Sequence, residues 1–323
     1  FFASIYGLIY SVNLFNDIEP FEEFYLDTGD GHSLYVELSG KSDGLPVLFL
    51  HGGPGAGSNQ IYRRYFDPSV YKIIIFDQRG SGKSKPFASC ENNTSQKLIN
   101  DIKVLLDHLA VKKTIIYGGS WGSTLALLYS QAYPETVHSL VLRGIFLCRS
   151  NDIKWFYQSG AHEIFPDYWK KFLDGLEDNE KEDILESFHK KIHSNDKNLS
   201  QKYCNQWAEW EGNCSSLLPS KEVVDQFNKC AISLAKIESH FFINNCFIKE
   251  NQILENINLI KNIKCYIVHG RYDVVCPINQ AFALHNSYEN SEMFVIQDAG
   301  HSLLEPGITE KIFKIFKNPN DLN

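Results

Sequence analysis

The feature that most constrains the fold is a series of short apolar segments that alternate with helical patterns in the first half of the chain. We predict β-strands at residues 34–38, 46–50, 72–76, 114–117 and 139–142. The last four are nearly all apolar, which is typical of strands covered on both faces of a sheet. Between them, segment 95–109 predicts a helix with Ser95 as its N-cap and one apolar stripe. This alternation favours an α/β fold, a mostly parallel sheet flanked by helices.

The alternation stops in the middle of the chain. Charged and aromatic segments with a helical pattern occupy this stretch, at 179–191, 200–211 and 221–236. Beyond them we predict strands at 264–269 and 292–297 and a final helix near 308–316. We therefore expect an α/β core formed by residues 1–148 and 263–323, with an inserted helical cap at 149–262.

Composition excludes several classes of function. The 323 residues are 43% apolar, enough for a sizeable core, and the net charge of -8 comes with no basic stripe. We therefore expect no nucleic-acid partner. No stretch approaches the roughly 18 apolar residues of a membrane span, so we expect no membrane partner. The oligomeric state is not indicated by the sequence.

Cysteine usage points to a reducing compartment. The eight cysteines are spread along the chain without any C-x-x-C pair, so we expect free thiols and no zinc site. A cytoplasmic location follows as an expectation. The apolar opening segment 1–12 is not preceded by Met, which is compatible with an upstream targeting segment having been removed.

The clearest chemical motif is Gly118-Gly119-Ser120-Trp121-Gly122, which fits G-x-S-x-G. It lies between a predicted strand and a predicted helix, which is the context that exposes a nucleophilic serine on a sharp turn. Glycines suit this turn because neighbours with Cβ atoms would crowd a strained residue. We predict Ser120 as the nucleophile of a serine hydrolase.

A second glycine-rich segment, His51-Gly52-Gly53-Pro54-Gly55, follows the predicted strand 46–50. Backbone N–H groups in such a loop can stabilise an oxyanion, and we assign this role to Gly53 together with Trp121. A phosphate-binding loop is the alternative, but no Lys-Ser/Thr follows at the required spacing. The segment 77–84, DQRGSGKS, also fails the spacing of a nucleotide loop, so we interpret it as a structural turn.

A nucleophilic serine needs a base that is held by a third group. In this type of fold the order along the chain is Ser, then Asp or Glu, then His, with the last two after late strands. Asp273 and His301 stand at those positions. Asp298 is the rival acid, but it adjoins the histidine loop and does not follow a strand of its own.

The combination of HGGPG at 51–55, DQRGSG at 77–82, GGSWGS at 118–123 and LRGIF at 142–146 resembles the prolyl aminopeptidases, also called proline iminopeptidases, of the α/β-hydrolase superfamily. The likeness covers most of the chain, from about residue 19 to 307. It implies an α/β-hydrolase fold whose helical cap closes over the substrate, and small peptides with N-terminal proline as substrates.

The resemblance also implies which residues bind the amine. Glu211 stands in a W-x-x-W-E motif and Glu238 in an I-E-x-H-F pattern, and buried carboxylates can hold a cationic amine. Glu209 is the local rival and is expected to face solvent. Phe146 is expected to wall the proline ring, as are Trp121 and, less directly, two further aromatic residues, Phe156 and Tyr157.

The predicted reaction is release of N-terminal proline through the Ser-His-Asp triad and a covalent acyl-enzyme, with no metal or organic cofactor. Two alternatives remain open from the residues themselves. One is a carboxylesterase or lipase-like hydrolase, and the other is a catalytically silent binding module on the same fold. An intact Ser, Asp and His argues against the second.

Overall fold

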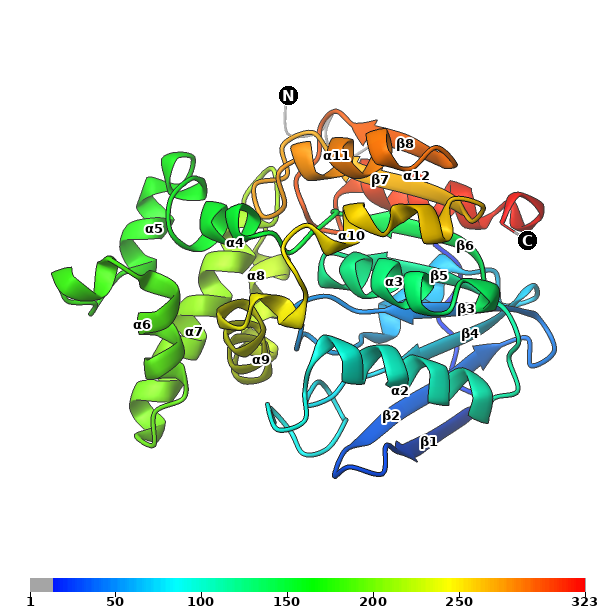
Figure 1. Cartoon of the computed structure of the whole chain (residues 1–323), viewed down its shortest axis with the longest axis horizontal. Coiled ribbons are helices and arrows are strands. Elements are labelled where there is room, and N and C mark those ends of the chain that lie inside the picture. Colours follow the sequence, from blue (N-terminus) through cyan, green and yellow to red (C-terminus); the bar gives the residue numbers. More distant parts are fainter. Residues whose placement is uncertain (1–13, 323) are drawn as a thin grey trace.

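The computed structural model describes residues 14–322 and forms a single mixed sheet in this part of the chain (Figure 1). Its strands lie in the order β1-β2-β4-β3-β5-β6-β7-β8. Their bounds are β1 Glu22–Asp27, β2 Ser33–Gly40, β3 Leu45–Leu50, β4 Tyr71–Phe76, β5 Thr114–Gly119, β6 Val137–Arg143, β7 Lys264–Gly270 and β8 Ser291–Ile296. Strand β2 pairs antiparallel with β1 and β4, and every later neighbouring pair is parallel. The predicted α/β-hydrolase fold is confirmed.

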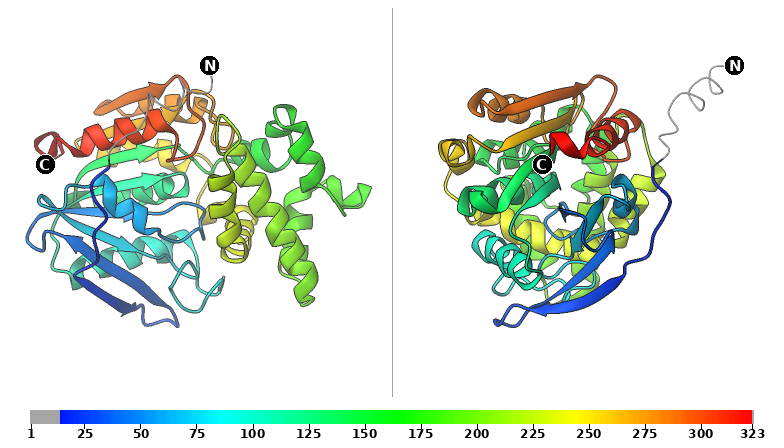
Figure 2. Two further views of the ribbon diagram at one scale, coloured as in Figure 1. Left: turned by 180° about the vertical axis from the view of Figure 1, so that it is seen from behind. Right: turned by 90° about the vertical axis from the view of Figure 1, so that its right-hand side faces the viewer.

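Helices cover both faces of the sheet, which explains why the central strands are apolar throughout. The helices of the core are α2 Ser95–His108, α3 Trp121–Ala132, α10 Gln252–Glu255, α11 Asn279–Ser287 and α12 Pro306–Phe316. In β4, Ile74 packs in the core cluster that includes α2, α3 and α11, whereas Ile73 and Ile75 pack in the cluster that includes α12. Figure 2 shows α12 on the face opposite α2 and α3.

The inserted helices lie beyond one end of the sheet (Figure 1). They are α4 Ser150–Tyr157, α5 Pro166–Phe172, α6 Ile184–Ile192, α7 Lys197–Cys214, α8 Lys221–Lys229 and α9 Ala231–Ile243. Helix α7 packs against α5, α6, α8 and α9, so it is the centre of this layer. The chain then returns to the core, where α10 and a short 3-10 helix at Ile257–Ile260 contact α3. The division at residues 149 and 262 stays a prediction.

Several local predictions differ from the structure. The N-cap of α2 is Thr94, whose hydroxyl accepts from the Lys97 N–H. The Ser95 hydroxyl instead donates to the Cys246 carbonyl, just after the last cap helix α9. The helix predicted at 221–236 is two helices that break at Cys230. Strand β1 was not predicted, because most of its residues are exposed and it lacks an apolar pattern.

The apolar opening segment 1–12 lies outside the described residues. Between residues 14 and 322, none of the helices combines the length and apolar character that a membrane span requires.

Candidate active site

Ser120 occupies the sharp turn between β5 and α3. Its backbone dihedrals are φ 58° and ψ -127°, a conformation that residues with side chains rarely adopt. The flanking glycines are required sterically. A Cβ atom at Gly118 would lie 2.2 Å from the Gly122 carbonyl oxygen, and one at Gly122 would lie 2.2 Å from the Leu50 carbonyl oxygen. The motif therefore allows the turn to pack directly on the end of β3.

His301 and Asp273 are joined by a buried hydrogen bond. His301 Nδ1 lies 2.7 Å from Asp273 Oδ2, and Asp273 Oδ1 accepts from the Cys276 N–H at 2.8 Å. Burial alone would raise the pKa of the Asp273 carboxyl, but the adjacent His301 imidazole and these hydrogen bonds hold it below its ordinary value. The rival Asp298 is exposed. Of the two acids, Asp273 is the one that contacts His301.

A second histidine, which the sequence analysis did not single out, also borders this pair. His269 Nε2 lies 3.4 Å from Asp273 Oδ2, and its ring also contacts the Cys276 carbonyl and the Ile145 N–H. The Ile145 N–H donates to Nδ1 and the Cys276 carbonyl accepts from Nε2, which is the pattern of a neutral ring, and burial lowers the pKa of His269 in the same direction. The sequence could have indicated a role for His269, because this residue lies at the end of β7 and four residues before Asp273.

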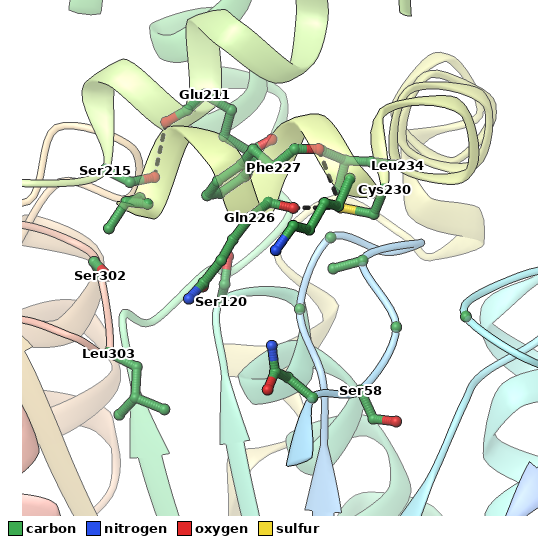
Figure 3. A pocket seen from close by; sticks show the side chains of 18 of the residues that line it. Ser58, Ser120, Glu211, Ser215, Gln226, Phe227, Cys230, Leu234, Ser302 and Leu303 are labelled. Atoms are coloured by element: carbon green, nitrogen blue, oxygen red, sulfur yellow. Dashed lines mark hydrogen bonds between the residues drawn. The ribbon is translucent and has the colours of Figure 1, made fainter. Parts of the chain in front are cut away.

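Ser120 and His301 line the same open cavity of about 380 Å³ between the cap and the core. Figure 3 shows Glu211, Gln226 and Phe227 on the cap side of this cavity and Ser120 on the core side. Ser302 and Leu303 lie along one side. The cavity combines glycine backbone, polar groups and apolar side chains. It can accept an extended ligand that reaches the Ser120 hydroxyl.

Gly53 and Trp121 lie where two strands end beside Ser120. Gly53 lines the cavity, and Trp121 is the first residue of α3, directly after Ser120. Within residues 14–322, neither backbone N–H donates to a backbone carbonyl. Both N–H groups are therefore free to donate to an oxyanion, and the N-terminus of α3 adds a favourable dipole.

Glu211 of α7 and Glu238 of α9 are both buried in the cap. Glu238 Oε2 accepts from the Trp207 indole N–H at 2.5 Å, whereas Glu211 Oε2 has no hydrogen-bond partner. Burial raises the pKa of Glu211 to about 7, and burial together with the charge of Glu211 raises the pKa of Glu238 well above its ordinary value. The titrations of two adjacent buried carboxyl groups are coupled, because the charge of one raises the pKa of the other.

The two carboxyl groups reach a small second cavity of about 20 Å³, which Ser120 and Gly53 also line. Its other walls are mainly apolar and are formed by Phe146, Ile153, Phe156, Tyr157, Phe242, Val275 and Cys276. A third carboxylate, Asp152, also lines it but is already paired with Arg149 at 2.9 Å. Phe146 and both weaker aromatic candidates are thus in this cavity. Trp121 is instead buried against Phe241 and is not among the residues that line it. Glu209 is exposed on α7, as expected.

The segment 77–84 forms a closed turn at the end of β4. The Asp77 carboxylate accepts from the backbone N–H groups of Ser58 and Lys83, at 2.6 and 2.7 Å, so it fills the space that a phosphate would need. The structural interpretation of this segment therefore agrees with its geometry. Among residues 14–322 no three His, Cys, Asp or Glu side chains are grouped in a way that could hold a metal ion.

Solved structures with similar folds are hydrolases and related enzymes at low sequence identity. A bromoperoxidase from Bacillus anthracis superposes with a TM-score of 0.67 at 19% identity, covering 93% of this chain and all of that one. At this identity the likeness shows the fold alone. It is the same fold that the sheet order and the helical layers describe.

Sequence relatives are closer. The α/β hydrolase fold family matches residues 46–307. A proline iminopeptidase of Arabidopsis thaliana is 45% identical, with 93% of this chain and 80% of the relative covered. One of Xylella fastidiosa is 42% identical over 91% of this chain and 95% of the relative. The chain belongs to the α/β-hydrolase superfamily and, within it, to the proline iminopeptidase family.

Proposed function

We propose that this chain is a serine exopeptidase that releases N-terminal proline from small peptides. The observation that carries the proposal is the position of Glu211 and Glu238, two buried carboxyl groups at the inner end of a cavity that also reaches Ser120. Ionising a buried carboxyl pair that has no cation beside it costs free energy, because the charges are removed from water without compensation. A ligand that brings a cation would offset this cost. The ammonium of an N-terminal proline would supply that charge next to the scissile carbonyl.

The two cavities suggest how a peptide binds. The small cavity is walled by Phe146 and Phe242 and bordered by both carboxyl groups, so its lining suits a compact apolar ring with one charged nitrogen. At about 20 Å³ it has room for roughly one water molecule, so its aromatic walls must move apart to admit the ring. The open cavity lies on the other side of Ser120 and has space for the residues that follow proline. A residue before proline would have to displace the carboxyl pair, which supports an exopeptidase.

The chemistry follows from the positions of the side chains. His301 takes the proton of the Ser120 hydroxyl as the serine oxygen attacks the carbonyl carbon of proline, and Asp273 stabilises the imidazolium that forms. The oxyanion accepts hydrogen bonds from the N–H groups of Gly53 and Trp121. Collapse of this intermediate breaks the peptide bond, and His301 gives its proton to the leaving amine. Water then hydrolyses the prolyl-enzyme and restores the serine hydroxyl.

A simple carboxylesterase on this scaffold would have no use for the buried carboxyl pair, because its acyl group carries no amine. A silent binding module would have no use for a strained serine beside a buried histidine–aspartate pair. Labelling by a fluorophosphonate separates the silent module from the enzymes. Replacing Ser120 by Ala should abolish both this labelling and proline release without unfolding the chain.

The decisive experiment compares Glu211→Gln with Glu209→Gln, an exposed residue on the same helix. We expect Glu211→Gln to lower kcat/KM for proline β-naphthylamide by about 10- to 100-fold, since a hydrogen bond to a charged group contributes about 1.5–3 kcal/mol. Hydrolysis of p-nitrophenyl acetate, which has no amine, should change little. Glu209→Gln should leave both unchanged. Equal losses on both substrates would remove Glu211 from amine binding.

An N-acylated prolyl amide provides the second test, because it lacks the cation and is extended before proline. Its rejection supports the exopeptidase, and its efficient hydrolysis would contradict it. We also propose a cytoplasmic location, which is supported by the eight free thiols of the chain.

A further inference from the structure

Gln78 is a buried side chain that the mechanism above does not use. It lies two residues beyond the end of β4, in the turn at 77–84, and only 1% of it is exposed. Its amide Nε2 donates to the His51 carbonyl at 2.9 Å, and its amide Oε1 accepts from the Trp121 indole N–H at 2.9 Å. Its backbone N–H donates to His51 Nε2, also at 2.9 Å.

The chemistry of the partners fixes the orientation of this amide. A carbonyl oxygen can only accept and an indole N–H can only donate, so Nε2 must face His51 and Oε1 must face Trp121. His51 is fixed in the same way. Its Nε2 accepts from Gln78, and its Nδ1 lies 2.9 Å from the Gly52 carbonyl and donates to it. Burial lowers the pKa of His51, which favours this neutral form.

The two ends of the Gln78 amide therefore hold the two sides of the oxyanion site. His51 begins the loop that carries Gly53 at the end of β3, and Trp121 begins helix α3. No other side chain in residues 14–322 hydrogen-bonds to both His51 and Trp121. A small shift of either element would change the separation of the two N–H groups, and such donors act only when they are correctly placed in advance.

We propose that Gln78 is a positioning residue of the reaction, which sets the separation between the Gly53 and Trp121 N–H groups by bridging the segments that carry them. The proposal rests on the proposed oxyanion role of these two groups. Gln78 does not touch the substrate and acts through the backbone of its neighbours. Its loss should therefore weaken transition-state stabilisation without weakening the ground-state binding of the amine by Glu211 and Glu238.

The test uses Gln78→Met, which keeps the side-chain volume and removes both hydrogen bonds, and Gln78→Glu, which keeps the acceptor for the Trp121 indole but places a carboxylate oxygen against the His51 carbonyl. Removing an oxyanion donor outright costs about 10²–10³ in kcat. We expect a displaced site to lose less, about 10- to 100-fold in kcat for proline β-naphthylamide in Gln78→Met, with KM changed less than about threefold. Gln78→Glu should also lower kcat more than KM, because repulsion between its carboxylate and the His51 carbonyl displaces the loop that carries Gly53.

The matched control is Gln280→Met. Gln280 is equally buried, and its Oε1 accepts from the Leu147 N–H at 2.9 Å, away from the two oxyanion segments. It should lower the melting temperature as Gln78→Met does while kcat stays near that of the parent. If the two substitutions lower kcat equally, or if kcat of folded Gln78→Met and Gln78→Glu stays within about twofold of the parent, Gln78 has only a structural role.

A fluorophosphonate separates this proposal from the proposed substrate. Its phosphoryl oxygen occupies the oxyanion site, but the reagent carries no amine for the carboxyl pair. The rate of inactivation should fall with kcat in both Gln78 variants and should be unaffected in Glu211→Gln. If the protein reacts with the fluorophosphonate but does not release proline, the substrate proposal fails, and the Gln78 proposal is still decided by the inactivation rates. If Gln78→Met does not fold, the same criteria apply to Gln78→Glu.

Discussion

The carboxyl groups of Glu211 and Glu238 are buried beside each other in the cap, and no Lys, Arg or His among residues 14–322 contributes a charge that lowers either pKa. Folding removes two acids from water here without providing a cation. Such an arrangement costs stability in the ligand-free protein, and the proposed binding of an amine would supply the charge that the fold leaves out.

Glu211→Gln should stabilise the ligand-free protein at alkaline pH. The pKa of Glu211 is raised from an ordinary 4.5 to about 7, so the native state keeps a proton that the unfolded state releases above pH 4.5. Stability therefore falls as the pH rises through this interval, by at most about 3.5 kcal/mol at about 1.4 kcal/mol per pKa unit. The variant lacks this loss.

Thermal unfolding of the variant and the parent at pH 5 and pH 8 measures this effect. The melting temperature of Glu211→Gln should exceed that of the parent at pH 8, and the difference should shrink at pH 5. Glu209→Gln, on the exposed side of α7, should show no such dependence. A parent that is the more stable protein at pH 8 would mean that the pair is not strained in the free protein.

The same pKa predicts how activity depends on pH. In the proposed function an ammonium binds the carboxyl pair only when Glu211 is ionised, so kcat/KM for proline β-naphthylamide should rise with pH and level off above about 7. The triad contributes its own dependence, which hydrolysis of p-nitrophenyl acetate reports separately. The ratio of the two rate constants, measured from pH 5 to 8, isolates the carboxyl pair. It should increase about tenfold per unit below 7 and be flat in Glu211→Gln. A ratio that does not vary with pH in the parent would rule out this linkage.

The sequence predicted those parts of the site that depend on local geometry. Ser120 was found because G-x-S-x-G needs glycines where β5 meets α3, and Asp273 because it follows a predicted strand. The sheet was predicted because strands buried on both faces are apolar throughout. Strand β1 was not predicted because it is an exposed edge strand. The break between α8 and α9 at Cys230 was not predicted because the helical periodicity continues through it.

Other parts could not be predicted because they depend on contacts between segments far apart in the chain. The hydrogen bond from Trp207 of α7 to Glu238 of α9 joins two residues that are 31 positions apart in the sequence. The hydrogen bond from Trp121 to Gln78 joins two residues that are 43 positions apart. Neither pair has a spacing that marks it. The motifs that contain Gln78 and Trp121 can be recognised in the sequence, but only the folded structure shows that these two side chains are hydrogen-bonded to each other. The positions of Glu211 and Glu238 came from the family resemblance, since their local sequence equally suits a solvated helix face.

Asp273→Asn should inactivate the enzyme while Asp298→Asn should not. The Asp273 carboxylate accepts from His301 Nδ1, and an amide at this position can instead donate to that nitrogen and stabilise the wrong tautomer. In a comparable triad this substitution lowers kcat by about 10⁴. Asp298 is exposed on the neighbouring loop, so its amide variant controls for the lost charge. Steady-state kinetics with proline β-naphthylamide measures kcat for both variants. A large loss of kcat in Asp298→Asn, with kcat retained in Asp273→Asn, would show that Asp298 is the acid of the triad.

The turn at 77–84 should contribute to stability and not to nucleotide binding. Arg79 is buried and forms two hydrogen bonds with Asp101 of α2, at 2.6 and 2.7 Å, so it fastens the turn to the helix. Asp101→Asn removes one carboxylate partner of Arg79, but the guanidinium keeps a second partner, Asp30, at 2.9 Å. We therefore expect a cost of about 1.5–3 kcal/mol, that of a hydrogen bond to a charged group, and not the larger cost of an uncompensated buried charge. Asp107→Asn on the same helix removes a more exposed pair with Lys103 and should cost less than about 1 kcal/mol. Urea unfolding of the two variants measures the difference, and KM for proline β-naphthylamide should be unchanged in both. Similar unfolding midpoints would show that the buried pair does not anchor the turn, and saturable binding of ATP would show that the turn binds a nucleotide.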